Sequence, residues 1–217
     1  MHRKITVKGT GYASVKPDLI VITLDVISKD FDYEAAMKKA TVSSHQLADA
    51  LEGVHFEKEA IKTTDFSVHT EYKSVKDRNG DYQSIFDGYS VRQNFRLEFV
   101  LDFKQLAKGL TAISTVSIEP ELNIQFTVKD SAGVSETLLR SATQNAREKA
   151  AILADASGVK LGEIMDIQYN WGRIDLYSKT DYRMQKSSMI LSEEINPYIV
   201  PEDIDVTDTV TFIWEIK

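Results

Sequence analysis

The order in which two hydrophobic periods alternate along the chain constrains its fold more than any other feature. Two long segments, Tyr33–Leu51 and Ala132–Ser157, repeat apolar residues at steps of three and four, which is the period of an amphipathic helix. The segments around them alternate apolar and polar residues, as half-buried strands do. Strands are expected at Leu19–Ile27, Thr64–Tyr72, Tyr89–Leu101, Leu122–Val128, Ile164–Trp171 and Val206–Ile216.

In chain order these elements give the series strand, helix, strand, strand twice. The first β-α-β-β-like half covers residues 1–102 and the second covers residues 118–217, with a shorter helix within 103–117 as the link. Alternating strands favour mixed or antiparallel sheets with helices packed on one face. The sequence therefore predicts an α+β fold, in which residues 1–217 form a single unit that can be subdivided into these two halves.

Cap and turn residues mark several boundaries. Asp30 or Asp32 is suited to cap the first long helix, and Gly158 is suited to end the second. Asn79-Gly80 is the strongest hairpin signal in the chain, and it predicts a tight turn between two long strands.

A long segment near the C-terminus, 170–203, has no sustained period and contains Pro197 and Pro201. A segment of this length without regular structure is uncommon inside a compact domain. Aromatic residues and methionine, which are enriched at the cores of interfaces, are frequent in it. It either folds back over its own sheet or docks on a neighbouring subunit, and we favour the second interpretation. Its large apolar residues include Trp171, Tyr177, Tyr182, Met184, Met189, Ile190, Leu191 and Tyr198.

The Gly9-Thr10-Gly11 stretch invites a phosphate-binding interpretation. A dinucleotide fingerprint needs a third glycine where Ser14 stands, and a helix should follow, whereas another strand-like run follows here. We therefore interpret the two glycines as a bend between two strands, with Pro17 opening the second strand.

Residues with catalytic or metal-binding chemistry do not form a recognisable motif. His69 and Glu71 share one face of a strand and could ligate a metal, but a partly exposed strand histidine is the favoured interpretation. No Gly-x-Ser-x-Gly motif occurs. Asp203, Asp205 and Asp208 are interpreted as turn residues at the start of a strand. We assign no catalytic, cofactor-binding or metal-ligating residue, and the histidines are His2, His45, His55 and His69.

The stretch around Asp77, Asn79 and Asp81 resembles the start of a calcium-binding loop. An EF-hand loop has glycine at its sixth position and a bidentate glutamate at its twelfth. Those positions are Tyr82 and Gly88 here, so a polar hairpin turn explains the acidic residues.

Composition narrows the partners and the compartment. The net charge is −7 at pH 7, which argues against a nucleic-acid partner because phosphate binding needs clustered Lys and Arg. The chain has no cysteine, so disulfides and thiolate chemistry are excluded. No apolar run is long enough for a transmembrane helix. The N-terminus has no apolar signal-peptide core before Lys8, so the chain as written is expected to be cytoplasmic, or periplasmic or at the cell surface if a leader has been removed.

Several stretches together are similar to one family. Four of them occur in the order expected for SIMPL-domain proteins: ITVKGTGYASVKPDLIVITLDV (Ile5–Val26), GYSV (Gly88–Val91), ATQNAREKAAILADASGVKLGEI (Ala142–Ile164) and IVPEDIDVTDTVTFIWEI (Ile199–Ile216). The resemblance covers nearly the whole chain. It implies a non-enzymatic α+β scaffold, from a family with periplasmic or surface-associated bacterial members. Some members are tied to oxidative-stress defence and some form ring-like homo-oligomers, and the family has no agreed catalytic residues to carry over.

Two hypotheses follow. The first is a non-enzymatic, homo-oligomeric scaffold or binding protein, linked to envelope or oxidative-stress functions, with the 170–203 segment as the candidate interface. The alternative is a small-ligand-binding or metal-binding protein, or an enzyme, with a pocket between the two halves where His69 or His45 meets two carboxylates.

Overall fold

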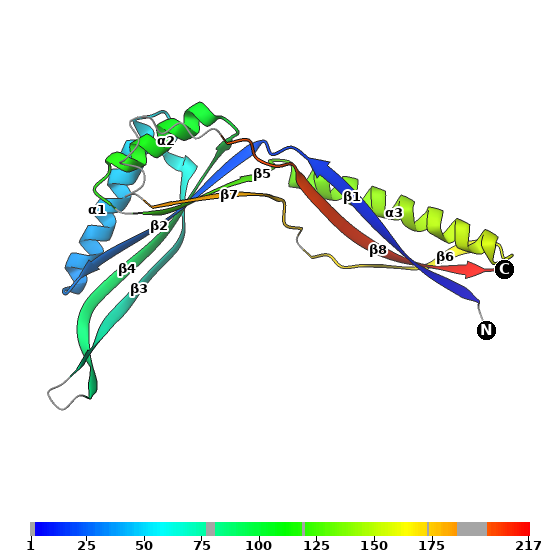
Figure 1. Cartoon of the computed structure of the whole chain (residues 1–217), viewed down its shortest axis with the longest axis horizontal. Helices are drawn as coiled ribbons and strands as arrows, with labels where there is room; N and C mark the ends of the chain where they lie inside the picture. The colour runs from blue at the N-terminus through cyan, green and yellow to red at the C-terminus, as the bar shows by residue number, and fades with distance from the viewer. Residues whose placement is uncertain (1–2, 77–80, 119, 173, 186–198) are drawn as a thin grey trace. The chain divides into compact units, whose positions relative to one another are not determined.

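The computed structural model describes residues 3–76, 81–118, 120–172, 174–185 and 199–217 (Figure 1). Within these residues the helices are α1 (Tyr33–Glu52), the short 3₁₀ helix η1 (Lys58–Ala60), α2 (Phe103–Thr115) and α3 (Ser131–Ala156). The strands are β1 (Lys4–Val15), β2 (Leu19–Asp30), β3 (Ile61–Lys76), β4 (Tyr82–Val100), β5 (Glu121–Thr127), β6 (Leu161–Tyr169), β7 (Tyr177–Gln185) and β8 (Ile204–Ile216). Each predicted helix and strand corresponds to an element of the structure, and the α+β class is confirmed.

The chain forms two compact units that are interleaved along the sequence. Unit 1 contains the described residues of 1–18, 127–179 and 201–217, and unit 2 contains those of 19–126 and 180–200. The predicted halves, in contrast, follow one another along the chain. The difference arises because β1 pairs with β8 over its whole length, from Lys4 opposite Glu215 to Val15 opposite Ile204, which joins the two ends of the chain in one unit.

Unit 1 is a three-stranded antiparallel sheet, in the order β1-β8-β6, with α3 packed on one face. The helix presents a stripe of small residues to the sheet, including Ala142, Ala146 and Ala150, all fully buried. They pack against Phe212 and Trp214, whose rings stack with centroids 5.1 Å apart. The small stripe lets the helix backbone approach the sheet closely. Gly158 follows the helix with a φ of 67°, a conformation that favours glycine.

The predicted bend at Gly9 and Gly11 is wrong. β1 runs unbroken through both glycines, and both are buried beneath α3. A Cβ atom on Gly9 would lie 2.0 Å from the carbonyl oxygen of Ala142, and one on Gly11 would lie 2.1 Å from that of Leu138. The glycines are therefore required where the helix backbone touches the strand, a contact between distant segments that no local pattern reveals.

Unit 2 is an antiparallel sheet in the order β3-β4-β2-β5-β7, with α1 and α2 packed on one face. Its core joins alternate residues of β2, such as Ile22 and Leu24, to Leu47 of α1 and Leu110 of α2. The carboxylate of Asp32 accepts a hydrogen bond from the backbone N–H of Ala35 at 2.9 Å, so Asp32 is the residue that caps α1.

The 170–203 segment is not devoid of regular structure, because β7 lies within it. Leu176 and Ser178 are buried, and the hydroxyl of Ser178 donates to the carbonyl oxygen of Glu202 at 2.7 Å. β7 is at the edge of its sheet and is mostly polar, so it lacks the apolar alternation that marks a half-buried strand. Residues 173 and 186–198, with much of the segment's apolar content, lie outside the described residues.

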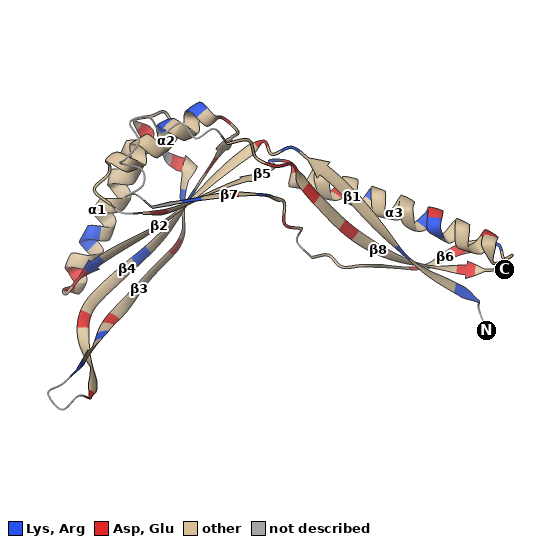
Figure 2. Cartoon of the chain, viewed as in Figure 1, with Lys and Arg blue, Asp and Glu red and all other residues tan. Residues whose placement is uncertain are grey.

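The described surface carries both signs of charge. Figure 2 shows acidic and basic residues interspersed along the helices and strands of both units. Among the described helices, none combines the length and the apolar composition needed to cross a membrane.

Candidate functional site

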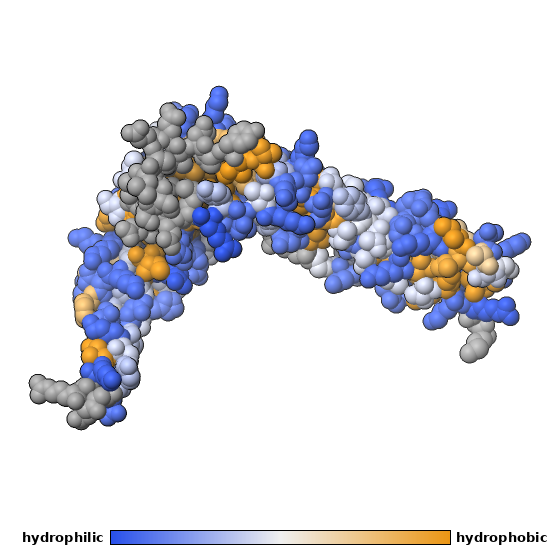
Figure 3. All heavy atoms as spheres, in the orientation of Figure 1, coloured by the Kyte–Doolittle hydropathy of each residue, from blue (hydrophilic) through white to orange (hydrophobic). Residues whose placement is uncertain are grey.

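An apolar surface lies along β6 in unit 1. α3 covers β1 and β8, whereas Ile164, Met165 and Ile167 of β6 remain 48–55% exposed. Trp171, 85% exposed, follows the strand, and its ring lies edge-on to that of Tyr169, with centroids 4.9 Å apart. We call Ile164, Met165, Ile167 and Trp171 the β6 patch. Figure 3 shows hydrophobic side chains at the surface where Figure 1 draws β6 and the C-terminal end of α3.

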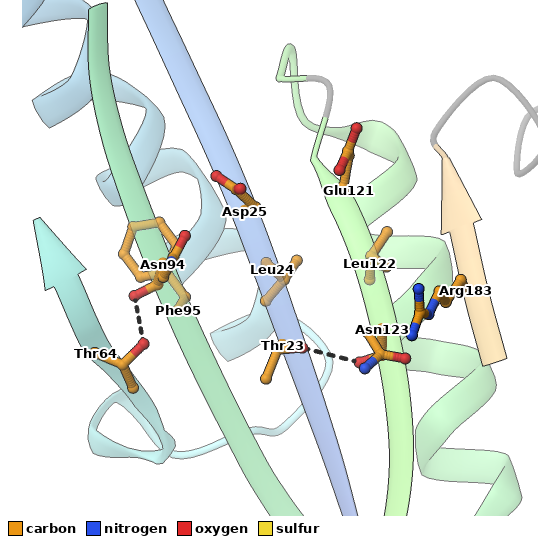
Figure 4. A pocket seen from close by; sticks show the side chains of 10 residues that line it. All are labelled: Thr23, Leu24, Asp25, Thr64, Asn94, Phe95, Glu121, Leu122, Asn123 and Arg183. Atoms are coloured by element: carbon orange, nitrogen blue, oxygen red, sulfur yellow. Dashed lines mark hydrogen bonds between the residues drawn. The ribbon is translucent and has the colours of Figure 1, made fainter. Parts of the chain in front are cut away.

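A polar hollow of about 620 Å³ lies on unit 2 (Figure 4). It is on the face of the five-stranded sheet opposite to α1 and α2, because Thr23 and Asp25 alternate along β2 with the core residues Ile22 and Leu24. Every strand of that sheet contributes a polar side chain to the lining: Thr64 of β3, Asn94 of β4, Thr23 and Asp25 of β2, Asn123 of β5 and Arg183 of β7.

Strand pairing fixes the position of these side chains. Asp25 and Asn94 are directly opposite each other in the β2–β4 pair, which places their Cβ atoms about 5 Å apart. The hydroxyl of Thr23 lies 3.4 Å from the backbone carbonyl oxygen of Asn123, and the hydroxyl of Thr64 donates to the backbone carbonyl oxygen of Asn94 at 3.2 Å. The threonines therefore hold neighbouring strands, while the amide and carboxylate groups are left to line the hollow.

Three oxygen atoms of the lining are buried and have no hydrogen-bond donor within the structure. They are Oδ1 of Asp25, Oδ1 of Asn94 and Oδ1 of Asn123. Nε of Arg92 lies 3.5 Å from Oδ1 of Asp25, which is an ion pair but too long for a well-formed hydrogen bond. A buried acceptor without a partner costs about 1–3 kcal/mol. The hollow is therefore suited to a molecule that supplies hydrogen-bond donors.

None of the histidines that the structure describes lines this hollow. His45 is exposed on α1, and His69 is exposed on β3, with Nε2 3.2 Å from the Ser67 hydroxyl. Glu71, proposed as its partner, instead accepts a hydrogen bond from the hydroxyl of Ser90 at 2.5 Å. Within the described part of the chain, no group of three or more His, Asp or Glu side chains is arranged to hold a metal ion.

The calcium-loop stretch is only partly described, since Asp77 and Asn79 lie outside the described residues. The strands on either side pair antiparallel as far as Lys76 opposite Tyr82, so the predicted pairing of two long strands is confirmed, whereas the predicted turn at Asn79-Gly80 lies outside the described residues.

Two acidic residues predicted to be turn residues, Asp205 and Asp208, instead lie within β8 and accept hydrogen bonds from tyrosines. The Tyr12 hydroxyl donates to Oδ1 of Asp205 at 2.7 Å, and the Tyr169 hydroxyl donates to Oδ2 of Asp208 at 2.6 Å. These hydrogen bonds raise the pKa of both tyrosines. Hydrogen bonds from Ser14 and Tyr12 lower the pKa of Asp205. Sequence reasoning missed these pairs because the two members of each pair lie on different strands, which only the folded sheet brings side by side.

The two antiparallel sheets, each with helices packed on one face, make this chain an α+β protein. A family model for SIMPL, described as "Protein of unknown function (DUF541)", matches residues 5–214. The chain therefore belongs to the SIMPL family, as the resemblance indicated.

The chain is also similar to two curated proteins. Each is a 26 kDa periplasmic immunogenic protein, one from Brucella melitensis biotype 1 and the other from Brucella abortus strain S19. In both cases 24% of residues are identical over 164 aligned residues, which cover 76% of this chain. The matched region spans 65% of the length of each relative.

Proposed function

We propose that this protein is a non-enzymatic scaffold or binding protein that assembles with further copies of itself. The observation that carries the proposal is the β6 patch. Large apolar patches on the surface of a soluble protein mark interaction sites, and tryptophan is enriched at the energetic centres of interfaces. A role in envelope or oxidative-stress functions stays a prediction from the family resemblance.

The patch is suited to a protein partner for a structural reason. β6 is an edge strand of its sheet, so a strand of a partner can add to its free edge while side chains of the partner cover Ile164 and Ile167. At the other edge strand of this sheet, β1, backbone N–H groups donate to side chains of α3 instead. The backbone N–H of Thr10 donates to Asn145 of α3 at 3.0 Å, and that of Tyr12 donates to Ser141 at 3.3 Å.

The predicted 170–203 interface is retained in part within this proposal. Trp171 belongs to the β6 patch, and Tyr182 is 44% exposed on β7. Leu176, in contrast, is buried within unit 1 and is unavailable to a partner. The proposed interface therefore begins in β6 and includes the first aromatic residue of the 170–203 segment.

Light scattering after size exclusion tests the assembly. We expect a native mass that is a multiple of 24.5 kDa, and we expect the double variant Ile167→Thr, Trp171→Ser to shift it toward 24.5 kDa. Val100→Thr is the matched control, because Val100 is 65% exposed on a strand of unit 2 and its substitution should leave the mass unchanged. A monomeric wild-type protein would contradict the assembly, and an unchanged mass in the double variant would contradict the role of the patch.

We place the protein in the periplasm within this proposal, because the similar Brucella proteins are named as periplasmic. Fractionation of the source cells with compartment markers tests this placement. Recovery of the protein with cytoplasmic markers would overturn it.

A second candidate function is supported by the three buried oxygen atoms of the polar hollow that have no hydrogen-bond donor. A small ligand rich in hydroxyl or amine donors, or a metal ion, would satisfy them. Thermal shift with glucose oligomers, spermidine and divalent metal ions tests this candidate, since a ligand at one hundred times its dissociation constant adds about 2.7 kcal/mol. Asn123→Leu is the matched variant: it removes one acceptor and should abolish the shift. If no probe shifts the wild-type protein, this candidate fails.

A further inference from the structure

We infer that β3 pairs antiparallel with β3 of a second copy of this chain, about a two-fold axis at His69. The inference rests on the proposed self-assembly, to which it adds a contact on unit 2 that is separate from the β6 patch. The pairing joins two five-stranded sheets into one continuous sheet with both α1 helices on the same face.

The first observation is the open edge of β3. The strand is 16 residues long and pairs with β4 along one side, while its other side is the edge of the described sheet. Most of its side chains are exposed, and none is buried. A long edge strand presents a row of backbone N–H and C=O groups, which is a template for another strand.

The second observation is the position of the irregularities along this hairpin. Register shifts occur between Thr63 and Asp65 and between Glu71 and Tyr72. Bulges bend a strand and are one way in which proteins protect an edge. From Asp65 to Glu71 the pairing with β4 is regular, so this stretch of the edge is suited to receive a partner strand.

The third observation is the charge pattern on the face of β3 that points away from α1. A two-fold pairing centred on His69 places Asp65 opposite Lys73 twice, once on each side of the axis. It also places Ser67 opposite Glu71 twice, so that a hydroxyl donor meets a carboxylate. Opposite charges across a strand pair are stabilising. Figure 2 shows this succession of acidic and basic positions along β3 and β4.

Neither neighbouring register keeps Asp65 opposite Lys73. Directly opposed residues point to the same face of a sheet, so the two-fold axis must lie midway between the two copies of one residue. The alternative registers are therefore those centred on other single residues. An axis at Val68 would oppose Asp65 to Glu71, two like charges. An axis at Thr70 would oppose Glu71 to His69, but it would separate Asp65 from Lys73 and leave the charge of Asp65 opposite Val75.

The fourth observation is an exposed group of aromatic rings on the α1 side of the same strands. The ring of Tyr72, 62% exposed, lies 6.2 Å from that of Phe86, which lies 5.4 Å from that of Tyr89. Phe66, 48% exposed, is on the same face, and the His69 register places it opposite Tyr72 of the second copy. The pairing therefore covers the exposed end of this aromatic group with a phenylalanine from the partner. Aromatic pairs across strands are among the stabilising cross-strand contacts.

Site-specific cross-linking tests the register, and because the chain has no native cysteine, the introduced cysteine is the only thiol in each variant. In the variant His69→Cys the two thiols oppose each other across the axis, with Cβ atoms about 4.5–5.5 Å apart. Mild oxidation should convert most of this variant to a disulfide-linked dimer. In the control Asp65→Cys the two thiols are about 27 Å apart, because eight residues separate the opposed positions at about 3.4 Å each, and it should stay unlinked.

Charge reversal provides a second test in chains that keep His69. Asp65→Lys opposes two lysines on each side of the axis and should reduce the dimer fraction at least tenfold. Lys73 also pairs with Asp87 of its own chain at 2.7 Å, so the rescue variant combines Asp65→Lys, Lys73→Asp and Asp87→Lys and should restore the dimer. Circular dichroism confirms that each variant is folded.

The outcomes separate this inference from the proposed function. Cross-linking of His69→Cys alone, with loss and rescue by charge reversal, supports the β3 pairing. A native mass above 24.5 kDa without cross-linking of His69→Cys, or with equal cross-linking of Asp65→Cys, overturns the β3 pairing and leaves the self-assembly standing. A wild-type protein that stays monomeric at high concentration overturns both.

Discussion

Adding one methyl group at Gly9 should destabilise unit 1 strongly. In Gly9→Ala the new Cβ would lie 2.0 Å from the carbonyl oxygen of Ala142 and 2.6 Å from the Cβ of Ala146. Ordinary contact begins near 3.4 Å, so α3 must move away from β1 by more than an ångström. The obstructing atoms belong to the helix backbone and to alanine, so no side-chain rotation relieves the overlap.

The loss in the free energy of unfolding depends on the packing contacts that α3 gives up when it moves. Ala142, Ala146 and Ala150 are fully buried against Val7 and Phe212. A gap of 0.5–1 Å forfeits about a quarter to a half of each van der Waals contact. Overpacking typically costs about 1–3 kcal/mol, and we expect the top of this range because the backbone itself is displaced. For a chain of this length about 3 kcal/mol lowers the melting temperature by about 6–12 °C.

Urea unfolding followed by circular dichroism measures this change. Thr10→Ala is the matched control, because its side chain is exposed on the opposite face and the hydrogen bond to Asn145 uses the backbone N–H of residue 10. We expect the control to stay within about 0.5 kcal/mol of wild type. A Gly9→Ala protein as stable as the control would refute the close packing of α3 on β1.

Three further predictions concern single positions. Gly158→Ala should lower the free energy of unfolding by about 1–2 kcal/mol because of its left-handed backbone alone, since nothing lies within 4 Å of a Cβ there. Gly158→Asn should lower it less when the two variants are compared by urea unfolding. Asp102→Ala should cost about 1 kcal/mol, because its carboxylate caps α2 by accepting from the backbone N–H of Lys104 at 2.8 Å, and Asp102→Asn should retain most of this in the same assay. Tyr12→Phe should reduce the free energy of unfolding between pH 3.8 and 10.0, and its difference from wild type should shrink outside this window. The lowered pKa of Asp205 gives stability that is lost as the pH falls through the pKa of Asp205 in the folded protein. The raised pKa of Tyr12 gives stability that is lost as the pH rises through the pKa of Tyr12 in the folded protein. A difference between variant and wild type that does not vary with pH would contradict the role of the Tyr12–Asp205 hydrogen bond.

Local periods along the chain were sufficient to predict most of its helices and strands. The three-to-four-residue repeat of Tyr33–Leu51 and the small-sided stripe of Ala132–Ser157 correspond to α1 and α3. Alternation in Tyr89–Leu101 and Val206–Ile216 corresponds to parts of β4 and β8. These predictions succeed because the period of a helix or strand depends on neighbours within a few residues, and burial on one face imposes it directly on the sequence.

β7 was missed because an edge strand with mostly polar side chains carries no hydrophobic period. The polar hollow was not predicted either, although each of its residues is visible in the sequence. Its lining comes from five strands, and Asp25 meets Asn94 only because β2 pairs with β4 in one particular register. A shift of that register by one residue would turn Asp25 toward the core.

The two glycines near the N-terminus show the same division most clearly. Composition and spacing identify Gly9 and Gly11 as positions where a side chain is absent, and both a bend and a close contact are consistent with that. The contact with Ala142 and Leu138 arises only when α3 is laid across β1, more than a hundred residues away along the chain. Local preferences of the chain therefore determine which helices and strands form, whereas the pairing of the chain ends and the packing of α3 determine what the glycines do, because steric exclusion acts between whichever atoms the fold brings together.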